Sequence, residues 1–397
     1  MKNNYFKNQT RIALTLAVLL LAACSKEKSQ PVEPEKPVVD QKDIAVIDQK
    51  IDQFLADNSF PGLSIAISRN GKLVYQKGYG IANVEAAEQV STDSRFRIAS
   101  VSKLITSVAV MKLVQDNKLV LTQKVFGPDG ILGTAYGKQP YKTYVGDITL
   151  SDLLHHTSGG WGQTNDPAFS TKTLDADGVI NWTLDNVLLT AKPGTTFNYS
   201  NFGYMLLSKI IAKASGKSYT DYVKEQILDK VGATNTSIAG TSLATRAQNE
   251  VRNYPQGGDA GFVYDYIDFN RADGAMGWLS TPKDLLLFTN AVDGSPVRPD
   301  ILNATTIGLM TTTTPASIGL GYHFGCGWVV EGDEWFWWGS LPGTFSMLYR
   351  NANGICISVT ANGRRQPTPE NALNGFIGIT NFISTDKNIA WQDIDQF

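Results

Sequence analysis

Residues 99–116 read ASVSKLITSVAVMKLVQD and hold the strongest local signal in the chain. Their apolar residues recur at helical spacing, which predicts a mostly buried helix. Ser100 and Lys103 lie three residues apart near its start, so their side chains share one face. The N–H groups and positive dipole end of a helix start favour an oxyanion there. A serine hydroxyl becomes a strong nucleophile only beside a base. The stretch therefore predicts a serine nucleophile, Ser100, with Lys103 as its activator.

A Ser-x-x-Lys pattern alone also fits a capping serine and a surface lysine, so a second motif matters. Tyr199-Ser200-Asn201 precedes another helical pattern, and in extended backbone Tyr199 and Asn201 project to the same side. The phenol of tyrosine has an ordinary pKa near 10, and a flanking lysine cation favours the phenolate. Tyr199 is therefore predicted to act as a base toward Ser100. Asn201 is predicted to orient Lys103 and to hold a substrate carbonyl.

Strand patterns lie at both ends of the chain, with helical patterns between them. Leu63–Ile67 and Leu73–Gln76 flank an Asn70-Gly71 turn and predict a β-hairpin. Four strand-like runs follow near the C-terminus: Gly321–Val330, Trp335–Gly339, Phe345–Arg350 and Gly354–Thr360. The other predicted helices are Asp43–Asp57, Asn201–Ala214, Tyr219–Val231, Pro282–Val292 and Glu370–Ile383.

This order predicts an α/β fold with a central antiparallel sheet, flanked by helices and built from both termini. Residues of about 43–121 and 303–397 would form the sheet domain, and about 122–302 an inserted, mostly helical domain. A cleft where the two parts meet is the expected place for a site.

The N-terminus is typical of a targeting segment. Positive residues precede the apolar run Ile12–Ala23, which is too short to span a bilayer permanently. The run ends in Leu21-Ala22-Ala23-Cys24, which resembles the lipobox of bacterial lipoproteins. The resemblance implies removal of residues 1–23 and acylation of Cys24. Residues 24–42 would then form a solvated tether. The expected location is the bacterial cell envelope, lipid-anchored, with the outer membrane preferred because Ser25 is not acidic. An ordinary signal peptide with an incidental cysteine is the alternative.

Composition excludes other classes of function. Lys and Arg number 35 against 37 Asp and Glu, which gives no basic field for nucleic acid. No metal-ligand spacing is present, and we expect neither a metal nor an organic cofactor.

Cys326 and Cys356 lie in strand-like stretches without a neighbouring histidine in sequence. Buried free thiols are expected, although sequence alone leaves their pairing open.

Together these motifs resemble the serine β-lactamase and penicillin-binding-protein family, in its class C-like branch. That branch includes class C β-lactamases, D-Ala-D-Ala carboxypeptidases, D-amino-acid peptidases and family VIII esterases. The matches run in order along nearly the whole chain after the tether: Pro61-Gly62, Phe96–Lys103, Leu153–Gly159, Phe197–Tyr204, Gly277, Ser280–Leu285, Gly325–Trp328 and Leu341-Pro342-Gly343. The resemblance implies that Ser100 is acylated, that Lys103 and Tyr199 activate it, and that His156 is structural.

The third motif of the family departs from the usual pattern. The family carries Lys or His, any residue and then Gly on its innermost strand, whereas this chain has Trp337-Trp338-Gly339. The resemblance still implies an oxyanion hole made by the backbone N–H groups of Ser100 and Ser340. Trp337 offers one neutral donor and an apolar face in place of a cation. Trp335 and Trp338 are expected on the opposite face of the strand.

A cation elsewhere is the alternative partner for a substrate carboxylate. Arg364 and Arg365 follow the last strand, near the place where class C β-lactamases bind that end of the substrate. The predicted substrate-binding residues are therefore Asn201, Trp337, Gly339 and Arg364.

The sequence thus predicts a serine hydrolase that works through an acyl-enzyme on small esters or on D-amino-acid amides or peptides. A β-lactamase or D-Ala-D-Ala carboxypeptidase is the first alternative. A non-catalytic envelope binding protein that keeps the fold is the second.

Overall fold

The computed structural model describes residues 41–169, 173–256, 262–318, 321, 323–365 and 369–397. A seven-stranded antiparallel sheet runs through it in the order β3-β2-β1-β11-β10-β9-β8. Its strands are β1 (Gly62–Arg69), β2 (Lys72–Asn83), β3 (Glu88–Gln89), β8 (Val329–Glu331), β9 (Glu334–Leu341), β10 (Thr344–Arg350) and β11 (Ile355–Ala361). N-terminal β1 pairs with C-terminal β11, Leu63 opposite Ala361, so both ends of the chain build one sheet as predicted.

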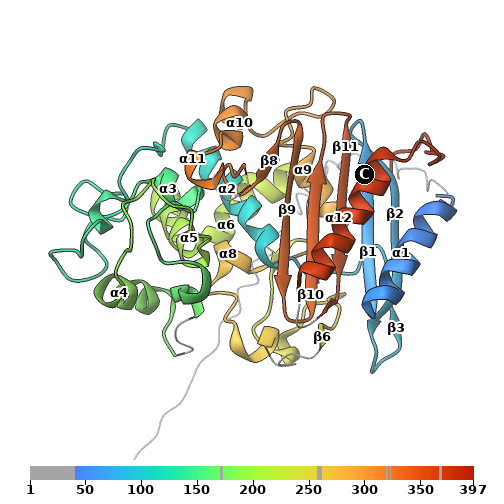
Figure 1. Ribbon diagram of the computed structural model, residues 1–397, viewed down its shortest axis with the longest axis horizontal. Coiled ribbons are helices and arrows are strands. Elements are labelled where there is room, and N and C mark those ends of the chain that lie inside the picture. The colour runs from blue at the N-terminus through green and yellow to red at the C-terminus, as the bar shows by residue number, and fades with distance from the viewer. Residues whose placement is uncertain (1–40, 170–172, 257–261, 319–320, 322, 366–368) are drawn as a thin grey trace, which may run out of the picture. The chain divides into compact units, whose positions relative to one another are not determined.

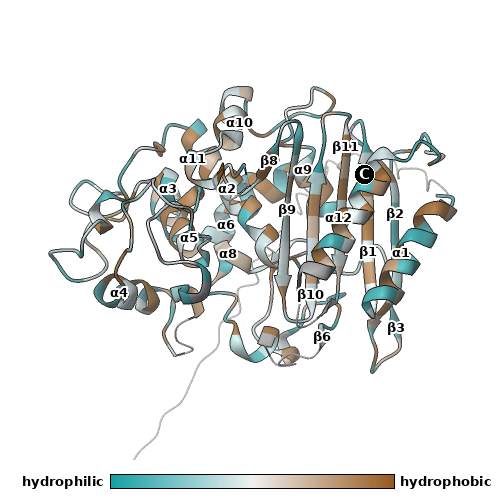
Figure 2. Cartoon of the chain, in the orientation of Figure 1, coloured by the Kyte–Doolittle hydropathy of each residue, from teal (hydrophilic) through white to brown (hydrophobic). Residues whose placement is uncertain are grey.

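Both faces of this sheet are covered, which explains the apolar runs in its strands. Helices α1 (Ala45–Asn58) and α12 (Pro369–Thr385) pack against each other on one face (Figure 1). On β1, Leu63, Ile65 and Ile67 alternate toward those helices, whereas Ala66 belongs to the core on the other side. Figure 2 shows β1 largely in the hydrophobic colour, whereas α1 carries both hydrophilic and hydrophobic residues.

The other face is covered by helices that include α9 (Pro282–Thr289), which packs against β1 and β11. The expected boundary at 302 assigns this helix to the inserted part, yet it covers the sheet. The remaining helices are α2 (Ser102–Gln115), α3 (Leu150–Leu154), α4 (Ala176–Asn186), α5 (Asn201–Ser215), α6 (Tyr219–Val223), α7 (Asp229–Val231), α8 (Asp273–Met276), α10 (Ala304–Thr311) and α11 (Pro315–Ile318). A π-helical turn at Lys224–Leu228 interrupts the single helix expected over 219–231.

Two small sheets join distant segments. The strand before the nucleophile, β4 (Phe96–Arg97), pairs with β7 (Trp278–Ser280), which also pairs with β5 (Ser237–Ile238). β6 (Tyr254–Gln256) pairs in parallel with β12 (Gly363–Arg365). Across the described part of the chain, we find no helix with both the length and the apolar character needed to cross a membrane. Residues 1–40, including Cys24, lie outside the described residues.

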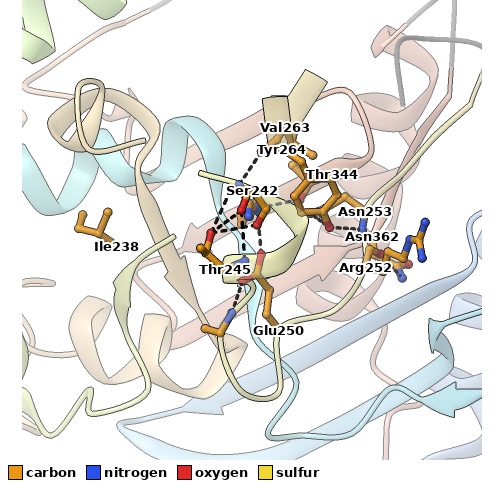
Figure 3. Close-up of polar contacts among 12 residues, drawn as sticks. Ile238, Ser242, Thr245, Glu250, Arg252, Asn253, Val263, Tyr264, Thr344 and Asn362 are labelled. Carbon is orange, nitrogen blue, oxygen red and sulfur yellow. Dashed lines mark hydrogen bonds and ion pairs between the residues drawn. The ribbon is translucent and has the colours of Figure 1, made fainter. Parts of the chain in front are cut away.

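A buried ion pair fixes the strand that leads to Ser100. Arg97 Nε donates to Glu250 Oε1 at 2.8 Å, and both side chains are fully buried. A second guanidinium nitrogen donates to the Val263 carbonyl at 2.7 Å, while Thr344 Oγ1 donates to the Arg97 carbonyl at 2.7 Å. Glu250, Val263 and Thr344, which are labelled in Figure 3, come from separate segments of the chain. The contacts tie Glu250, Val263 and Thr344 of β10 to the residue three positions before Ser100.

We expect Glu250→Ala to destabilise the protein by about 3–5 kcal/mol, because it leaves the Arg97 charge buried without its partner. Urea unfolding followed by circular dichroism measures this loss. The matched control is Lys124→Ala, which breaks an ion pair with Asp147 that is about half exposed on both sides; its cost should stay below about 1 kcal/mol. Equal small losses in the two variants would contradict a structural role for the buried pair.

Candidate active site

Ser100 lies at the junction of β4 and α2. Residues Ala99–Val101 form one 3-10 turn that leads into the α-helix, so Ser100 precedes α2 rather than lying within it. Ala99 has a positive φ of 45°, an uncommon conformation for a residue with a Cβ. Ser100 is only partly buried, whereas the residues on either side of it are buried. The turn therefore presents one hydroxyl to the adjacent pocket.

Lys103 reaches back to Ser100 as the sequence predicts. Its Nζ lies 3.3 Å from Ser100 Oγ, 2.7 Å from Asn201 Oδ1 and 2.8 Å from the Ala275 carbonyl oxygen. The side chain is fully buried. Burial lowers the pKa of the Lys103 amine to about 7, with the carboxylate of Asp166 opposing the shift. Near neutral pH a large fraction of Lys103 is therefore an uncharged amine, able to accept a proton.

Tyr199 also lies at the site, but in a different protonation state from the one expected. Lys103 Nζ lies 4.9 Å from the centroid of its ring. Burial raises the pKa of the phenol, and the neighbouring Ser100 and Trp337 side chains only partly offset that rise. Desolvation thus works against the phenolate that the sequence favoured, because its effect on the pKa of Tyr199 exceeds that of the neighbouring groups. Tyr199 is a phenol in the resting site.

The ring of His156 packs against the ring of Tyr199. Its ring lies 4.4 Å from the Tyr199 ring and 5.0 Å from that of Tyr204, between centroids. Its Nδ1 accepts the Ser200 N–H at 3.0 Å. Burial lowers the pKa of His156 well below its ordinary value, so the ring is neutral. These contacts match the structural role that the resemblance implies.

Gly339 lets strand β9 approach the nucleophile closely. A Cβ at this position would lie 2.1 Å from the Ile98 carbonyl oxygen and 2.8 Å from the Ser100 nitrogen. Ser346, opposite Gly339 on β10, donates from Oγ to the same Ile98 carbonyl at 2.7 Å. Ser340 follows on β9 and lines the same pocket as Ser100. This arrangement suits the predicted oxyanion hole formed by the Ser100 and Ser340 N–H groups.

The pocket beside Ser100 has a volume of about 330 Å³ and is mostly aromatic. It is lined by Ser100, Phe197, Tyr199, Phe324, Trp337, Trp338 and Ser340. Trp337 packs within it, its ring centroid 5.1 Å from Phe324 and 5.6 Å from Tyr199. None of these described lining residues carries a positive charge, so the pocket favours uncharged, apolar groups.

Trp338 differs from what the sequence suggested, whereas the two cysteines agree with it. Trp338, expected on the opposite face of β9 from Trp337, also lines the pocket, and the two ring centroids are 4.3 Å apart. Cys326 and Cys356 are buried free thiols, which confirms the expectation. Cys326 nevertheless has a histidine neighbour in space, because its Sγ lies 3.7 Å from His155 Nε2. Both side chains are buried and neither lines the pocket, so this contact is structural.

Arg364 lies on β12, where its backbone is opposite Pro255 of β6. Its side chain lies outside the described residues, so its predicted contact with substrate stays a prediction. The neighbouring Asn362 is buried and donates from Nδ2 to the carbonyls of Ile81 and Arg252, at 3.0 and 3.1 Å. Asn362 therefore holds the backbone in place just before Arg364.

Asp166 is a site residue that the sequence reasoning missed. Its buried carboxylate accepts from Asn201 Nδ2 at 3.0 Å and from the backbone N–H groups of Asn201, Phe202 and Ala168. Burial raises the pKa of Asp166 to about 6, against the effect of these donors and of Lys103. Asp166 lies in a loop 35 residues before Asn201, and no spacing pattern links the two.

The described residues contain no group of three or more His, Cys, Asp or Glu side chains placed to hold a metal ion. The arrangement of side chains beside the pocket is suited to acyl transfer. A partly exposed serine, a buried amine with a pKa near 7 and a phenol meet beside an apolar pocket. With the antiparallel sheet, they define the class of proteins that share the β-lactamase and penicillin-binding-protein fold.

Comparisons with known proteins agree with this class. The model of the β-lactamase family matches residues 47–381, and the chain belongs to that family. It is 28% identical over 365 residues to Protein flp of Staphylococcus aureus strain N315, covering 88% of this chain and 70% of the relative. It is 27% identical over 366 residues to a protein of Escherichia coli O157:H7 named "Putative D-alanyl-D-alanine carboxypeptidase", covering 81% of each.

A solved structure extends the likeness to three dimensions. The octameric penicillin-binding protein homologue from Pyrococcus abyssi superposes with a TM-score of 0.69 at 25% identity. The match covers 85% of this chain and 78% of that one.

Proposed function

We propose that this protein is a serine hydrolase that forms an acyl-enzyme on Ser100 and acts on uncharged small esters or on amides of D-amino acids. The observation that carries the proposal is the contact of the Ser100 hydroxyl with a buried lysine whose pKa is near 7. Family membership supports the coarser statement, since β-lactamase-family proteins are generally serine hydrolases.

In the proposed first step, neutral Lys103 accepts the proton of Ser100 Oγ while that oxygen attacks the substrate carbonyl carbon. The carbonyl oxygen takes the negative charge between the Ser100 and Ser340 N–H groups. The bond to the leaving group then breaks, and the leaving group receives a proton from Tyr199, which regains one from protonated Lys103. An acyl ester on Ser100 remains.

In the second step, water attacks this ester and gives a proton to Lys103 through Tyr199. Protonated Lys103 then gives its proton to Ser100 Oγ as the ester bond breaks, and the carboxylic acid leaves. Asn201 holds Lys103 in place through both steps, by the hydrogen bond between Lys103 Nζ and Asn201 Oδ1. The cycle consumes one water for each substrate and needs no cofactor.

Substrate preference is proposed from Trp337 and its aromatic neighbours. A substrate carboxylate placed in this pocket loses its hydration and meets no cation among the described lining residues, which is costly. We therefore expect neutral short-chain esters or amides to react faster than penicillins or free-carboxylate peptides. A panel of p-nitrophenyl esters, D-amino-acid amides, D-Ala-D-Ala peptides and a chromogenic cephalosporin tests this order. It also separates the esterase or amidase from the β-lactamase and carboxypeptidase alternatives.

Replacing Trp337 with lysine is expected to shift kcat/KM toward the carboxylate-bearing member of a matched substrate pair. A hydrogen bond to a charged group contributes about 1.5–3 kcal/mol, or roughly 10- to 100-fold in the ratio. The control is Trp335→Lys, which adds the same charge two residues away on β9, at a residue that does not line the pocket. The ratio of kcat/KM for the two substrates should be the same in Trp335→Lys as in the wild type.

The competing explanation assigns the carboxylate to Arg364 or Arg365. If the wild type already prefers the carboxylate-bearing substrate, and Arg364→Ala or Arg365→Ala removes that preference, the argument from Trp337 is wrong.

We also propose attachment to the bacterial envelope through acylated Cys24, with the outer membrane as the preferred location. The lipobox-like Leu21–Cys24 supports this proposal. Mass spectrometry of the mature N-terminal peptide tests it: a diacylglyceryl-modified Cys24 is expected, and a mature terminus elsewhere contradicts it.

A further inference from the structure

We infer that Asp166 is a positioning residue that fixes the orientation of the Asn201 amide and so holds Lys103 beside Ser100. The inference rests on the proposed function, because it concerns the activation of Ser100. Asp166 is not placed to touch the reacting atoms, and it acts through Asn201 and Lys103.

The hydrogen bonds of Asp166 fix which way the Asn201 amide points. A carboxylate only accepts hydrogen bonds, so Asn201 must present its NH₂ group to Asp166 Oδ2, 3.0 Å away. The amide oxygen is then left for Lys103 Nζ, 2.7 Å away on the other side. A reversed amide would place acceptor against acceptor at Asp166 and donor against donor at Lys103. Asp166 therefore determines that Lys103 meets an acceptor and holds its position beside Ser100.

The same carboxylate is held firmly in place. Its Oδ1 accepts the N–H groups of Ala168 and Phe202 at 3.0 and 3.1 Å, and its Oδ2 also accepts the Asn201 N–H. Two of these donors belong to the first turn of α5, whose dipole favours a negative charge there. Asp166 is only 5% exposed, so water screens its charge little.

The charge of Asp166 acts on Lys103 against desolvation. Burial lowers the pKa of Lys103, and the Asp166 carboxylate raises it in part. The other titratable groups facing Lys103 are Tyr199 and Tyr204, whose rings lie 4.9 and 5.6 Å from Nζ, and His156 behind them. All three are neutral. On α8, Asp273 accepts the Gly274 N–H. Removing the Asp166 charge should therefore lower the pKa of Lys103 further.

The test compares the pH dependence of kcat/KM in the wild type and in Asp166→Asn and Asp166→Ser. Activity needs the neutral amine, so the wild-type rate should rise with pH through about 7. In both variants the midpoint of that rise should move to lower pH, by roughly one unit. At the plateau kcat should fall about 10- to 100-fold with KM nearly unchanged, because Lys103 loses its fixed position.

Two variants are needed because asparagine presents an NH₂ group to the N–H groups of α5, whereas the serine hydroxyl can still accept one of them. The matched control is Asp284→Asn. Asp284 is a buried carboxylate that accepts from the Asn235 N–H and from Thr236 Oγ1, away from Lys103. Its loss should lower stability without moving the midpoint.

The possible outcomes separate this inference from the proposed function. If the wild type is inactive and a fluorophosphonate does not label it, the proposed function itself is contradicted. If the wild type is active, and a folded Asp166→Asn or Asp166→Ser variant keeps both its midpoint and its kcat, the inference is overturned. The proposed function then still stands. If neither variant folds, the rate of Ser100 labelling in Asn201→Ala decides: a rate equal to that of the wild type overturns the inference, because Asp166 is inferred to position Lys103 through this amide.

Discussion

Ser100→Ala is expected to lower kcat by on the order of 10⁶-fold while leaving the fold intact, since removal of a catalytic nucleophile has effects of this size. Ser100 is only partly buried, and its hydroxyl contacts Lys103 rather than completing a core hydrogen bond. Steady-state kinetics on the best substrate of the panel measure the loss, and thermal unfolding checks the fold.

The matched control for this variant is Ser102→Ala, two residues along the same motif. Ser102 is fully buried, and its Oγ accepts the Trp278 N–H at 3.2 Å. Its loss should lower stability by about 1 kcal/mol and keep most of the activity. A Ser100→Ala variant that keeps the wild-type rate, or a Ser102→Ala variant that alone loses it, contradicts the assignment of the nucleophile.

Lys103→Met is expected to lower kcat by about 10²–10⁴-fold, the usual contribution of a positioned general base, with little change in KM. Methionine has no amine but a similar length, so it limits the cavity that alanine would leave. Tyr199→Phe should lower kcat within the same range. Because both residues serve one proton transfer, the double variant should be little worse than either single variant. Multiplicative losses would mean that the two act independently.

Lys112→Met is the control for Lys103→Met. Lys112 lies on the same helix, but it is partly exposed and pairs with Asp116 one turn later. Its kcat should match the wild type. The pH profile gives a further check: the rate of Lys112→Met should still rise through about pH 7, whereas the residual activity of Lys103→Met should lose that rise.

Local patterns predicted the elements of this fold well, because their periodicity is a property of neighbouring residues. The hairpin predicted from Leu63–Ile67 and Leu73–Gln76 corresponds to β1 and β2, and the Asn70-Gly71 turn lies between them as expected. Ser100 and Lys103 meet because they are three residues apart. One sheet built from both termini was expected from the strand patterns at the two ends of the chain, and the pairing of β1 with β11 confirms it.

Features that depend on distant contacts could not be predicted in this way. Asp166 joins the site only because its loop folds back over the start of α5. The protonation state of Tyr199 depends on burial, which the sequence argument weighed less than the nearby lysine. Trp338 lines the pocket although strand alternation placed it on the other face. In each case tertiary packing determines the environment of the side chain.

The most direct test of the central claim is labelling with a fluorophosphonate, followed by intact-mass analysis and peptide mapping. Such a probe reacts with a serine only when a neighbouring base activates it. We expect one adduct per chain on Ser100 in the wild type, strongly reduced labelling in Lys103→Met and none in Ser100→Ala. An unlabelled but folded wild-type protein, or an adduct on another serine that persists in Ser100→Ala, would contradict an acyl-enzyme at Ser100.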